Sequence, residues 1–292
     1  MKILHADSGR EMRGGQWQAL RLHQALIESG HESMLLACED GPLRAMTMQR
    51  GLPCEQLHAL RLGQRTKGFD LLHAHDARSH TLGALFSRIP LVVSRRVAFP
   101  LGTSVASRQK YRRARRYLAV SHFVAGMLRD AGIEDARIDV VYDGVEVPPI
   151  AAVGDAIVTP FTLDPAKGMA LAQEAAKRAG VPLICSKDLE RDLAHSRALL
   201  YLTESEGLGS GILLAMAYGV TVIATSTGGI PELITDGVSG ILVQNEPNSV
   251  ANALRRVDPA LGLAAREIVR DRFTVRHMVA ATLEAYRKAL HD

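Results

Sequence analysis

The chain has few cysteines and no long apolar run, and these two features argue against a disulfide-rich protein and against a membrane-spanning one. Its 292 residues include three cysteines, Cys38, Cys54 and Cys185, which lie far apart in the sequence. An odd number of widely separated cysteines argues against a disulfide framework and favours a reducing compartment. No apolar run approaches the roughly 20 residues of a membrane-spanning helix, and residues 2–7 are too short for a signal peptide. We therefore expect a cytoplasmic protein, either free or peripheral at the inner face of the membrane.

The chain also lacks a strong excess of charge of either sign. It has 35 Lys and Arg residues against 31 Asp and Glu residues, a formal net charge of +4. This small excess does not predict binding to nucleic acid. Hydrophobic residues make up 47% of the chain and charged residues 23%, which permits a packed core and argues against wholesale disorder. The length is sufficient for two α/β domains.

Short apolar runs alternate with amphipathic segments along the chain. The first three are a strand at residues 3–6, a helix at 16–29 and a strand at 33–37. Strands that alternate with helices predict a parallel sheet. Pro148-Pro149 and the small residues after them predict a linker between two domains. Further strands are expected at 91–94, 117–121, 138–142, 156–160, 181–185, 198–202 and 220–224, and further helices over 168–179, 212–218, 250–257, 261–271 and 274–290.

A glycine-rich loop separates an expected strand from an expected helix in the second half. Residues 206–211 read Glu-Gly-Leu-Gly-Ser-Gly, and they lie between the strand at 198–202 and the helix at 212–218. Glycines let backbone N–H groups approach an anion at a helix N-terminus, and the helix dipole favours its negative charge. Glycines before a helix also occur as ordinary loop punctuation. The loop alone therefore indicates a phosphate site without establishing one.

Two motifs follow strands of the first half. Gly14 and Gly15 lie where the first strand leads into its helix, at the edge where open sheets bind ligands, although they also suit a plain flexible loop. His73 and His75 fall at the end of a strand, and strand alternation places both on one face. Two histidines can ligate a metal, but no third ligand is evident nearby, so no metal is expected. Hydrogen-bonded turn residues are the other interpretation.

A basic segment at residues 107–117 has no acidic residue to balance it. Such a run is commonly the solvated face of a helix. Attraction to anionic lipid headgroups or to a phosphorylated acceptor is the sharper hypothesis. RNA binding is less favoured, because no stacking platform accompanies the basic residues. The cations considered for acceptor or membrane contact are Arg95, Arg96, Arg112, Arg113 and Arg116.

Several short motifs of the second half, taken together, resemble the nucleotide-sugar domain of glycosyltransferase family 4. They are Glu-Gly-Leu-Gly at 206–209, Ala-Met-Ala-Tyr-Gly at 215–219, Val-Ile-Ala at 222–224, Gly-Gly-Ile-Pro-Glu at 228–232 and Asp-Gly-Val-Ser-Gly-Ile-Leu-Val at 236–243. Members of this family are retaining transferases of the GT-B fold. The resemblance implies an α/β protein with two Rossmann-like domains whose parallel sheets face a central cleft. The expected divisions are an acceptor-side domain at 1–148, a shortened nucleotide-sugar domain at 149–274, and a terminal helix at 275–292 that packs back on the first domain.

The resemblance also implies roles for individual residues. Glu206 and His75 would be catalytic, with Glu206 binding the sugar hydroxyls and His75 contacting the sugar or assisting the acceptor, while His73 would be structural. Lys167 would bind the donor diphosphate. No metal or other cofactor is implied, since cations and helix N-termini can neutralise the leaving diphosphate. The other implied donor-binding residues are Gly14, Gly15, Gly207, Leu208, Gly209, Ser210 and Gly211.

The chain departs from the family pattern in three ways. Leu214 stands where the family has a second glutamate, which accepts hydrogen bonds from the donor ribose, and losing such a bond costs about 1.5 to 3 kcal/mol. The segment between Lys167 and Glu206 is shorter than usual. The family's arginine before Lys167 is absent, and its substitutes would be Arg95, Arg96 or Lys187.

The sequence therefore predicts a glycosyltransferase that moves a sugar from a nucleoside-diphosphate-sugar to an acceptor with retention. Expected partners are the nucleotide-sugar donor, a lipid-linked, phosphorylated or saccharide acceptor, and an anionic membrane surface. The basic segment indicates envelope polysaccharide, lipopolysaccharide or glycolipid assembly. The alternative is a catalytically degenerate GT-B homologue that binds a nucleotide, sugar or protein, which Leu214 and the shortened domain would favour.

Overall fold

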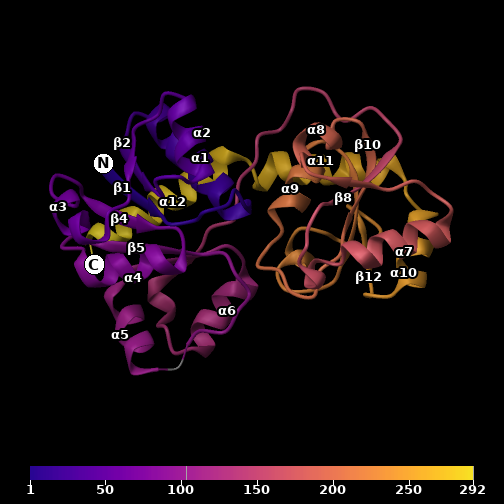
Figure 1. Cartoon of the computed structure of the whole chain (residues 1–292). Helices are drawn as coiled ribbons and strands as arrows, with labels where there is room; N and C mark the ends of the chain where they lie inside the picture. The colour runs from indigo at the N-terminus through magenta and orange to yellow at the C-terminus, as the bar shows by residue number, and fades with distance from the viewer. Residues whose placement is uncertain (103, 292) are drawn as a thin grey trace. The chain divides into compact units, whose positions relative to one another are not determined.

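The computed structural model describes residues 1–102 and 104–291 (Figure 1). The chain forms two compact units, each built on its own parallel sheet. Unit 1 contains Met1–Gly144 and the chain from Val275 onward, and unit 2 is Val145–Thr274. Pro148, expected in a linker, belongs to unit 2, where its carbonyl accepts a hydrogen bond from Arg266.

Unit 1 has a seven-stranded sheet in the order β3-β2-β1-β4-β5-β6-β7. The residues of β1 and β4 are apolar or histidine with few exceptions, because a parallel sheet is covered by helices on both faces. The register places His5 of β1 opposite His73 of β4. The strands are β1 (Lys2–Asp7), β2 (Glu32–Ala37), β3 (Cys54–Gln56), β4 (Leu71–Ala74), β5 (Leu91–Arg95), β6 (Arg116–Ala119) and β7 (Ile138–Val140).

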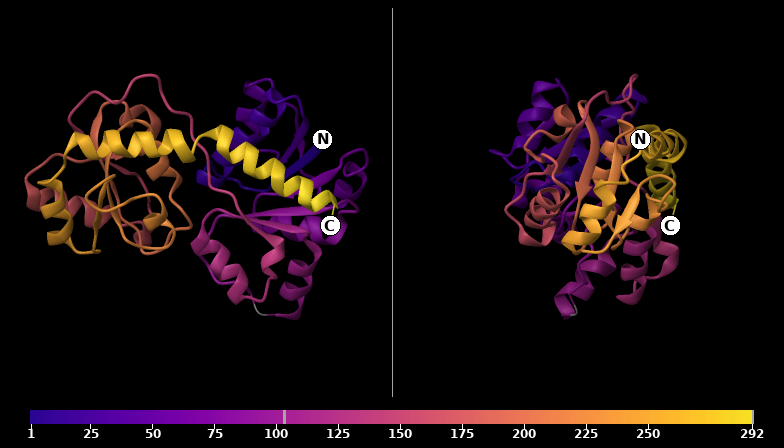
Figure 2. Two further views of the ribbon diagram at one scale, coloured as in Figure 1. Left: turned by 180° about the vertical axis from the view of Figure 1, so that it is seen from behind. Right: turned by 90° about the vertical axis from the view of Figure 1, so that its right-hand side faces the viewer.

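The C-terminal helix α12 (Val275–His291) is part of unit 1 (Figure 2). Its Met278 and Tyr286 lie in one core with Leu22, Val92 and Leu118. The other helices of the unit are α1 (Gly14–Glu28), α2 (Pro42–Gln49), α3 (Leu62–Arg65), α4 (Ala77–Phe86), α5 (Val105–Arg113) and α6 (His122–Asp130), with short 3₁₀ helices η1 (Ala59–Arg61) and η2 (Asp135–Arg137).

Unit 2 has a five-stranded sheet in the order β12-β11-β10-β8-β9. Its strands are β8 (Ala156–Pro160), β9 (Ile184–Ser186), β10 (Ser196–Tyr201), β11 (Thr221–Thr225) and β12 (Ile241–Val243). Its helices are η3 (Pro165–Lys167), α7 (Met169–Ala179), α8 (Leu189–Leu193), α9 (Ser210–Ala217), η4 (Ile230–Glu232), α10 (Pro247–Leu254) and α11 (Pro259–Arg272). The core of the unit joins β10 and β11 to small residues of α7 and to α10.

The α/β class and the parallel sheets expected from the sequence are confirmed. The expected strand at 181–185 is β9 (Ile184–Ser186), which begins three residues later. Helix α4 was not predicted, because its residues are mostly small or polar and include Gly83, so its apolar periodicity is weak. Among the described residues, no helix is long and apolar enough to span a bilayer.

Candidate active site

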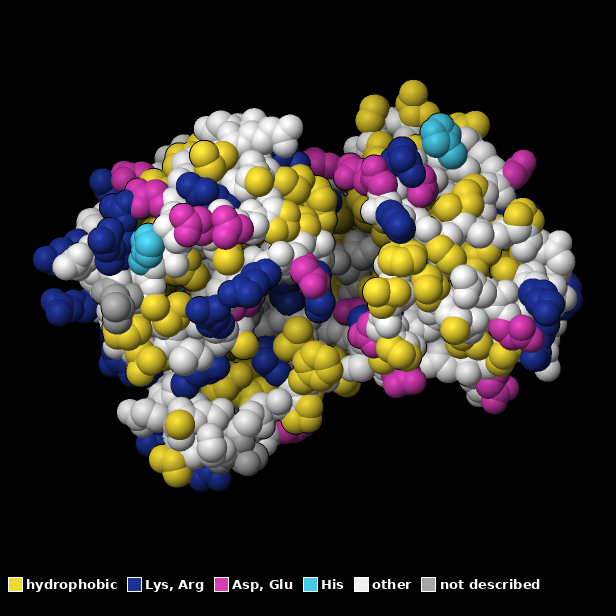
Figure 3. Space-filling view, in the orientation of Figure 1, with side chains coloured by type: hydrophobic (Ala, Val, Ile, Leu, Met, Phe, Trp, Pro, Cys, Tyr) yellow, Lys and Arg dark blue, Asp and Glu magenta, His cyan; other side chains and the backbone are white. Residues whose placement is uncertain are grey.

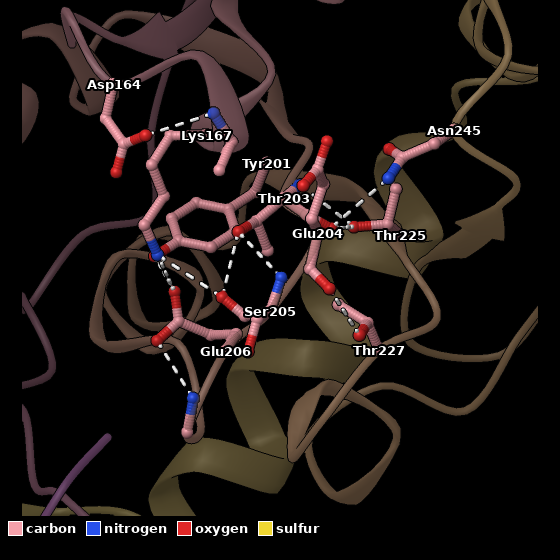
Figure 4. A network of polar contacts seen from close by, with 12 residues as sticks. Asp164, Lys167, Tyr201, Thr203, Glu204, Ser205, Glu206, Thr225, Thr227 and Asn245 are labelled. Carbon is pink, nitrogen blue, oxygen red and sulfur yellow. Dashed lines mark hydrogen bonds and ion pairs between the residues drawn. The ribbon is translucent and has the colours of Figure 1, made fainter. Parts of the chain in front are cut away.

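Glu206 and Lys167 meet at the carboxyl edge of the sheet in unit 2 (Figure 4). Glu206 lies in the loop between β10 and α9, and Lys167 ends the 3₁₀ turn that follows β8. Since β8 and β10 are neighbouring parallel strands, the loops after them open on the same edge. The order of the strands thus brings Lys167 and Glu206 together, although almost forty residues separate them in the sequence. Lys167 Nζ lies 2.9 Å from Glu206 Oε2.

The Glu206 carboxylate is held by three donors. Besides Lys167, the Tyr201 hydroxyl donates to Oε2 at 2.8 Å, and the Gly207 N–H donates to Oε1 at 3.1 Å. Burial, followed by the Glu206 charge, raises the pKa of Tyr201 well above its ordinary value, so the hydroxyl keeps its proton and remains a donor. The carboxylate is therefore fixed in place before any ligand arrives.

The backbone of the glycine-rich loop is shaped by residues without a side chain. Gly209, with φ of 109°, precedes the first residue of α9, and no side chain among the described residues caps this helix. The first-turn N–H groups of a helix have no intrahelical acceptor, so this terminus suits an anion. Gly228 lies against the Glu206 main chain so closely that a Cβ would collide with the Glu206 carbonyl, and Gly229 N–H donates to that carbonyl at 3.1 Å.

Hydrogen bonds between neighbouring loops support the segment before Glu206 (Figure 4). Thr225 Oγ1 accepts from the Thr203 N–H at 3.0 Å and donates to the Thr203 carbonyl at 2.7 Å. Thr227 donates to the Glu204 carbonyl at 3.1 Å. The ends of β10 and β11 are thereby joined, which holds the loop that carries Glu206.

The other loop residues predicted to bind the donor differ in how exposed their side chains are. Leu208 is only 2% exposed, so its side chain belongs to the core and only its main chain can face a donor. Ser210 and Leu214 lie four residues apart and therefore share one face of α9. Gly211 is packed against the Tyr201 ring, because a Cβ there would come within 3.0 Å of a ring carbon.

Lys187 places another cation at this edge of the sheet. It follows β9, the strand beside β8, and its side chain is exposed. Its Nζ lies 4.9 Å from the centre of the Phe161 ring, a cation–π contact. Phe161 follows β8 directly, so Lys187 and Lys167 both lie beyond the carboxyl end of this strand pair.

Unit 1 contains a buried histidine cluster at the carboxyl ends of β1 and β4. The ring centres of His73 and His75 are 4.0 Å apart, which confirms that both lie on one face of the strand. His73 forms hydrogen bonds with the Tyr286 hydroxyl of α12 at 2.7 Å and with the Ser94 hydroxyl of β5 at 2.8 Å. His73 therefore joins the terminal helix to the sheet.

Arg96 fixes the hydrogen-bonding direction within this cluster. A guanidinium only donates, so its contact of 3.3 Å with His75 Nδ1 makes that nitrogen an acceptor. The proton of neutral His75 is then on Nε2, which donates to His5 Nδ1 at 2.9 Å. His5 must therefore carry its own proton on Nε2, an atom that is buried and has no partner among the described residues. Burial lowers the pKa of His75 well below its ordinary value, which keeps the ring neutral.

His5 adds a third histidine to the His73 and His75 pair. Its ring nitrogens and those of His73 and His75 include atoms within 4.8 Å of one another, a grouping able to hold a metal ion. No third candidate ligand is evident near His73 and His75 in the sequence, but strand pairing brings His5 beside His73 from a distant part of the chain. A metal would have to replace the bonds these rings already make, including the pair of bonds to His73.

Arg96 also pairs with Asp143 and lies over the first turn of α1. Its Nε donates to Asp143 Oδ1 at 3.1 Å, and both side chains are largely buried. A Cβ on Gly15 would lie 3.8 Å from the Arg96 side chain, so Gly15 lies beside it; we call Gly15 and the preceding Gly14 the α1 wall. Arg96 thus connects the glycine pair with the histidine cluster.

The basic residues proposed as one contact surface lie at two edges of the sheet. Arg95 ends β5, at the carboxyl edge, whereas Arg116 begins β6 at the amino edge. The expectation that Arg116 contacts a membrane or acceptor was wrong. Arg116 is buried and pairs with Asp139 of β7 at 2.8 Å, so it is not available to either. Arg112 and Arg113 end α5 near it and are exposed.

Two family models match the chain in succession. Residues 12–147 match the model described as Glycosyltransferase Family 4, and residues 166–257 match the model described as Glycosyl transferases group 1. The first match covers most of unit 1 and the second most of unit 2.

Curated relatives match over part of their length. An alpha-maltose-1-phosphate synthase of Mycolicibacterium smegmatis is 35% identical over 96 residues, which are 28% of this chain and 25% of the relative. A D-inositol 3-phosphate glycosyltransferase of Nocardioides is 34% identical over 115 residues, 37% of this chain and 25% of the relative. The chain thus aligns with about a quarter of the length of these relatives.

Solved structures match over nearly the whole chain. The Anabaena protein HepE, in complex with UDP and glucose, superposes with a TM-score of 0.83 at 19% identity, covering 97% of this chain and 98% of that one. The lipopolysaccharide outer core galactosyltransferase WaaB superposes with a TM-score of 0.71 at 15% identity, covering 98% and 99%. The solved structures show that the chain has the GT-B fold. By the two family models, which together match most of its length, the chain belongs to glycosyltransferase family 4.

Proposed function

We propose that this protein transfers a sugar from a nucleoside-diphosphate-sugar to an acceptor with retention of configuration. The observation that carries the proposal is the cluster of Lys167, Glu206 and Tyr201 beside the uncapped, glycine-led N-terminus of α9. It combines a cation and a helix N-terminus for a diphosphate with a fixed carboxylate for hydroxyl groups. This combination supports a nucleotide-sugar site within unit 2.

The ion pair between Lys167 and Glu206 suggests how the site accepts its donor. Lys167 would turn from Glu206 toward the incoming diphosphate, where it neutralises charge that grows as the leaving group departs. Glu206 Oε2 would then have room to accept hydrogen bonds from the sugar. Tyr201 and the Gly207 N–H would keep the carboxylate in place during this exchange.

The donor base and the sugar follow from the solved relatives only by analogy. HepE has been crystallised with UDP-glucose as well as with UDP, so we propose a UDP-sugar, with a hexose the first to test. His75 would contact the sugar or assist the acceptor, with Arg96 and the Gly14-Gly15 wall beside it. No metal is required, because Lys167 and the α9 N-terminus supply positive charge at the diphosphate.

For the acceptor we propose a lipid-linked, phosphorylated or saccharide molecule of cell-envelope assembly, used by a cytoplasmic or membrane-peripheral enzyme. The names of the relatives support this range, since one acts on a lipopolysaccharide core and others are named for phosphorylated products or acceptors. Arg95 and Arg96 lie at the carboxyl edge of their sheet, where a phosphorylated acceptor would find a cation.

A degenerate module that binds without turnover is the second candidate. Leu214 favours it, because a leucine cannot accept the hydrogen bonds of the donor ribose. The arrangement of Lys167 and Glu206 argues against a degenerate module. Their Nζ and Oε2 atoms lie 2.9 Å apart, and the Tyr201 hydroxyl also donates to Glu206.

Donor turnover distinguishes the two candidates. The protein would be incubated with UDP-glucose, UDP-N-acetylglucosamine, GDP-mannose and ADP-glucose, and release of the nucleoside diphosphate would be followed with and without simple sugar acceptors. We expect release from one donor, reduced at least a hundredfold in Glu206→Gln. Nucleotide binding with no release from any donor would favour the degenerate module.

A further inference from the structure

A hollow in unit 1 is lined by five arginines. It has a volume of about 580 Å³, and its lining residues are Arg112, Arg113, Ala114, Arg115, Arg116, Ala136 and Arg137. We call it the arginine hollow. On the face drawn in Figure 3, basic side chains lie among acidic and uncharged ones, whereas none of the described residues that line the arginine hollow is acidic.

The arginine hollow lies at the opposite edge of the sheet from the histidine cluster. Arg116 is the first residue of β6, and Arg137 precedes the first residue of β7. His75 and Arg96 instead follow the last residues of β4 and β5. Because all strands of this sheet are parallel, the two groups lie at its amino and carboxyl edges. The hollow is therefore separate from the proposed catalytic residues of unit 1.

Most of the positive charge in the hollow is not neutralised by protein. No described residue that lines it is acidic. Arg116 pairs with Asp139 at 2.8 Å, and Asp139 is shared with Lys288 of α12 at 3.0 Å. The neighbouring Asp135 pairs with Arg129 at 2.6 Å instead. Several guanidinium groups thus converge without matching counter-charges.

Two of these arginines are held in place by uncharged partners. Arg137 donates to the carbonyls at the end of α5, including that of Arg112 at 3.2 Å and that of Ala114. Arg113 donates to the carbonyls of Ala84 and Ser87 at 3.2 and 3.4 Å. A carbonyl fixes the direction of a guanidinium but leaves its net charge, so these cations are positioned without being neutralised.

The two remaining arginines have exposed side chains. Arg112 and Arg115 are exposed, and within residues 1–102 and 104–291 neither guanidinium has a protein partner. Guanidinium groups bind phosphate with paired, charge-assisted hydrogen bonds. We propose that the arginine hollow is a binding site for a multiply charged phosphate ester, held by Arg112 and Arg115 against the fixed charge of Arg113 and Arg137. The ester comes either from an anionic lipid headgroup or from a free phosphorylated compound.

The test compares one double variant with a control of equal charge. Arg112→Gln/Arg115→Gln removes the two exposed cations, whose guanidinium groups bond to no other described residue, so the fold should not depend on them. Lys177→Gln/Arg256→Gln removes two exposed cations from unit 2. Both pairs are made in the Lys167→Ala background, so that the donor site does not bind the probe.

Inorganic pyrophosphate, measured by calorimetry, represents free phosphate compounds. Vesicles of phosphatidylglycerol, compared with phosphatidylcholine in co-sedimentation, represent headgroups. We expect the hollow variant to weaken binding of at least one probe by about 30-fold, the effect of two basic residues near an anionic surface. The control pair should change it less than threefold.

The pattern of loss identifies the source of the phosphate. Loss of pyrophosphate binding alone assigns a free compound, and loss of vesicle binding assigns a headgroup. Equal weakening in the hollow variant and the control pair would show general surface attraction and overturn the proposal. Absence of binding to both probes in the starting protein would overturn it too. None of these outcomes depends on donor turnover.

Discussion

Lys167 Nζ and Glu206 Oε2 lie 2.9 Å apart at the carboxyl edge of the unit 2 sheet, although the two residues come from loops after different strands. The pair is partly buried, with side-chain exposures of 39% and 16%. In a ligand-free site it keeps the carboxylate and the ammonium from being left without a counter-charge. A donor must therefore compete with Glu206 for Lys167.

Tyr201→Phe should impair the chemistry more than nucleotide binding. The change removes the hydroxyl that donates to Glu206 but keeps the ring against Gly211. A hydrogen bond to a charged group contributes about 1.5 to 3 kcal/mol, so kcat should fall about tenfold or more. UDP affinity should stay within a factor of two to three, as calorimetry would show. An equal loss in both measurements would mean that Tyr201 serves only the fold.

Leu214→Glu should strengthen nucleotide binding. In the family the residue at this position accepts hydrogen bonds from the donor ribose, and Leu214 lies half-buried one turn after Ser210 on α9. Restoring the carboxylate should raise UDP affinity about ten- to a hundredfold. Leu214→Gln, which accepts hydrogen bonds without charge, should give a smaller gain. If neither variant improves affinity, the shortened domain places the ribose elsewhere.

The sequence identified the residues that meet in unit 2 better than those that meet in unit 1. Lys167 and Glu206 could be found because each lies in a local glycine-containing motif after a strand. Tyr201 could not, since only the fold shows that its hydroxyl reaches Glu206. His5 was missed for a similar reason: its partner His75 is seventy residues away, and strand register brings them together.

The wrong expectation for Arg116 also came from pairing between distant strands. Arg116 looked like one member of an unbalanced basic run, but β6 buries it against Asp139 from the next strand. The exposure of a charged residue depends on which element it begins or ends, and the helix-to-strand change between Arg113 and Arg116 is not marked by a glycine or proline.

Acidification should destabilise the protein. Burial lowers the pKa of His23 to about 4 and that of His80 to about 3, and it lowers the pKa of His5, His73 and His75 as well. An unfolded histidine takes up a proton below about pH 6.5, whereas these folded ones stay neutral, so the unfolded state binds more protons. The unfolding free energy should therefore fall as the pH drops.

Between about pH 6.5 and pH 5, His23 and His80 should each remove about 1.5 kcal/mol of stability. Urea denaturation at a series of pH values measures this slope. His80→Gln should make the slope shallower by about one proton. A stability that is constant or rises toward pH 5 would contradict the neutral, buried histidines.

Arg96→Met should destabilise unit 1, because it removes the guanidinium that pairs with the largely buried Asp143 carboxylate. Removing one member of a buried ion pair typically costs about 3 to 5 kcal/mol. Arg96→Met/Asp143→Asn removes both charges and should recover much of the loss in thermal denaturation. No recovery in the double variant would show that Arg96 matters through His75 and the α1 wall instead.

The central claim is that unit 2 holds a working donor site, and calorimetric titration with UDP, GDP and ADP tests it most directly. Wild-type protein and Lys167→Ala would be titrated side by side, with Lys177→Ala as an exposed lysine control from the same unit. We predict that one nucleotide, UDP, binds in the micromolar range, that Lys167→Ala abolishes this binding, and that the control retains it. Failure of all three nucleotides to bind the wild-type protein would contradict the account.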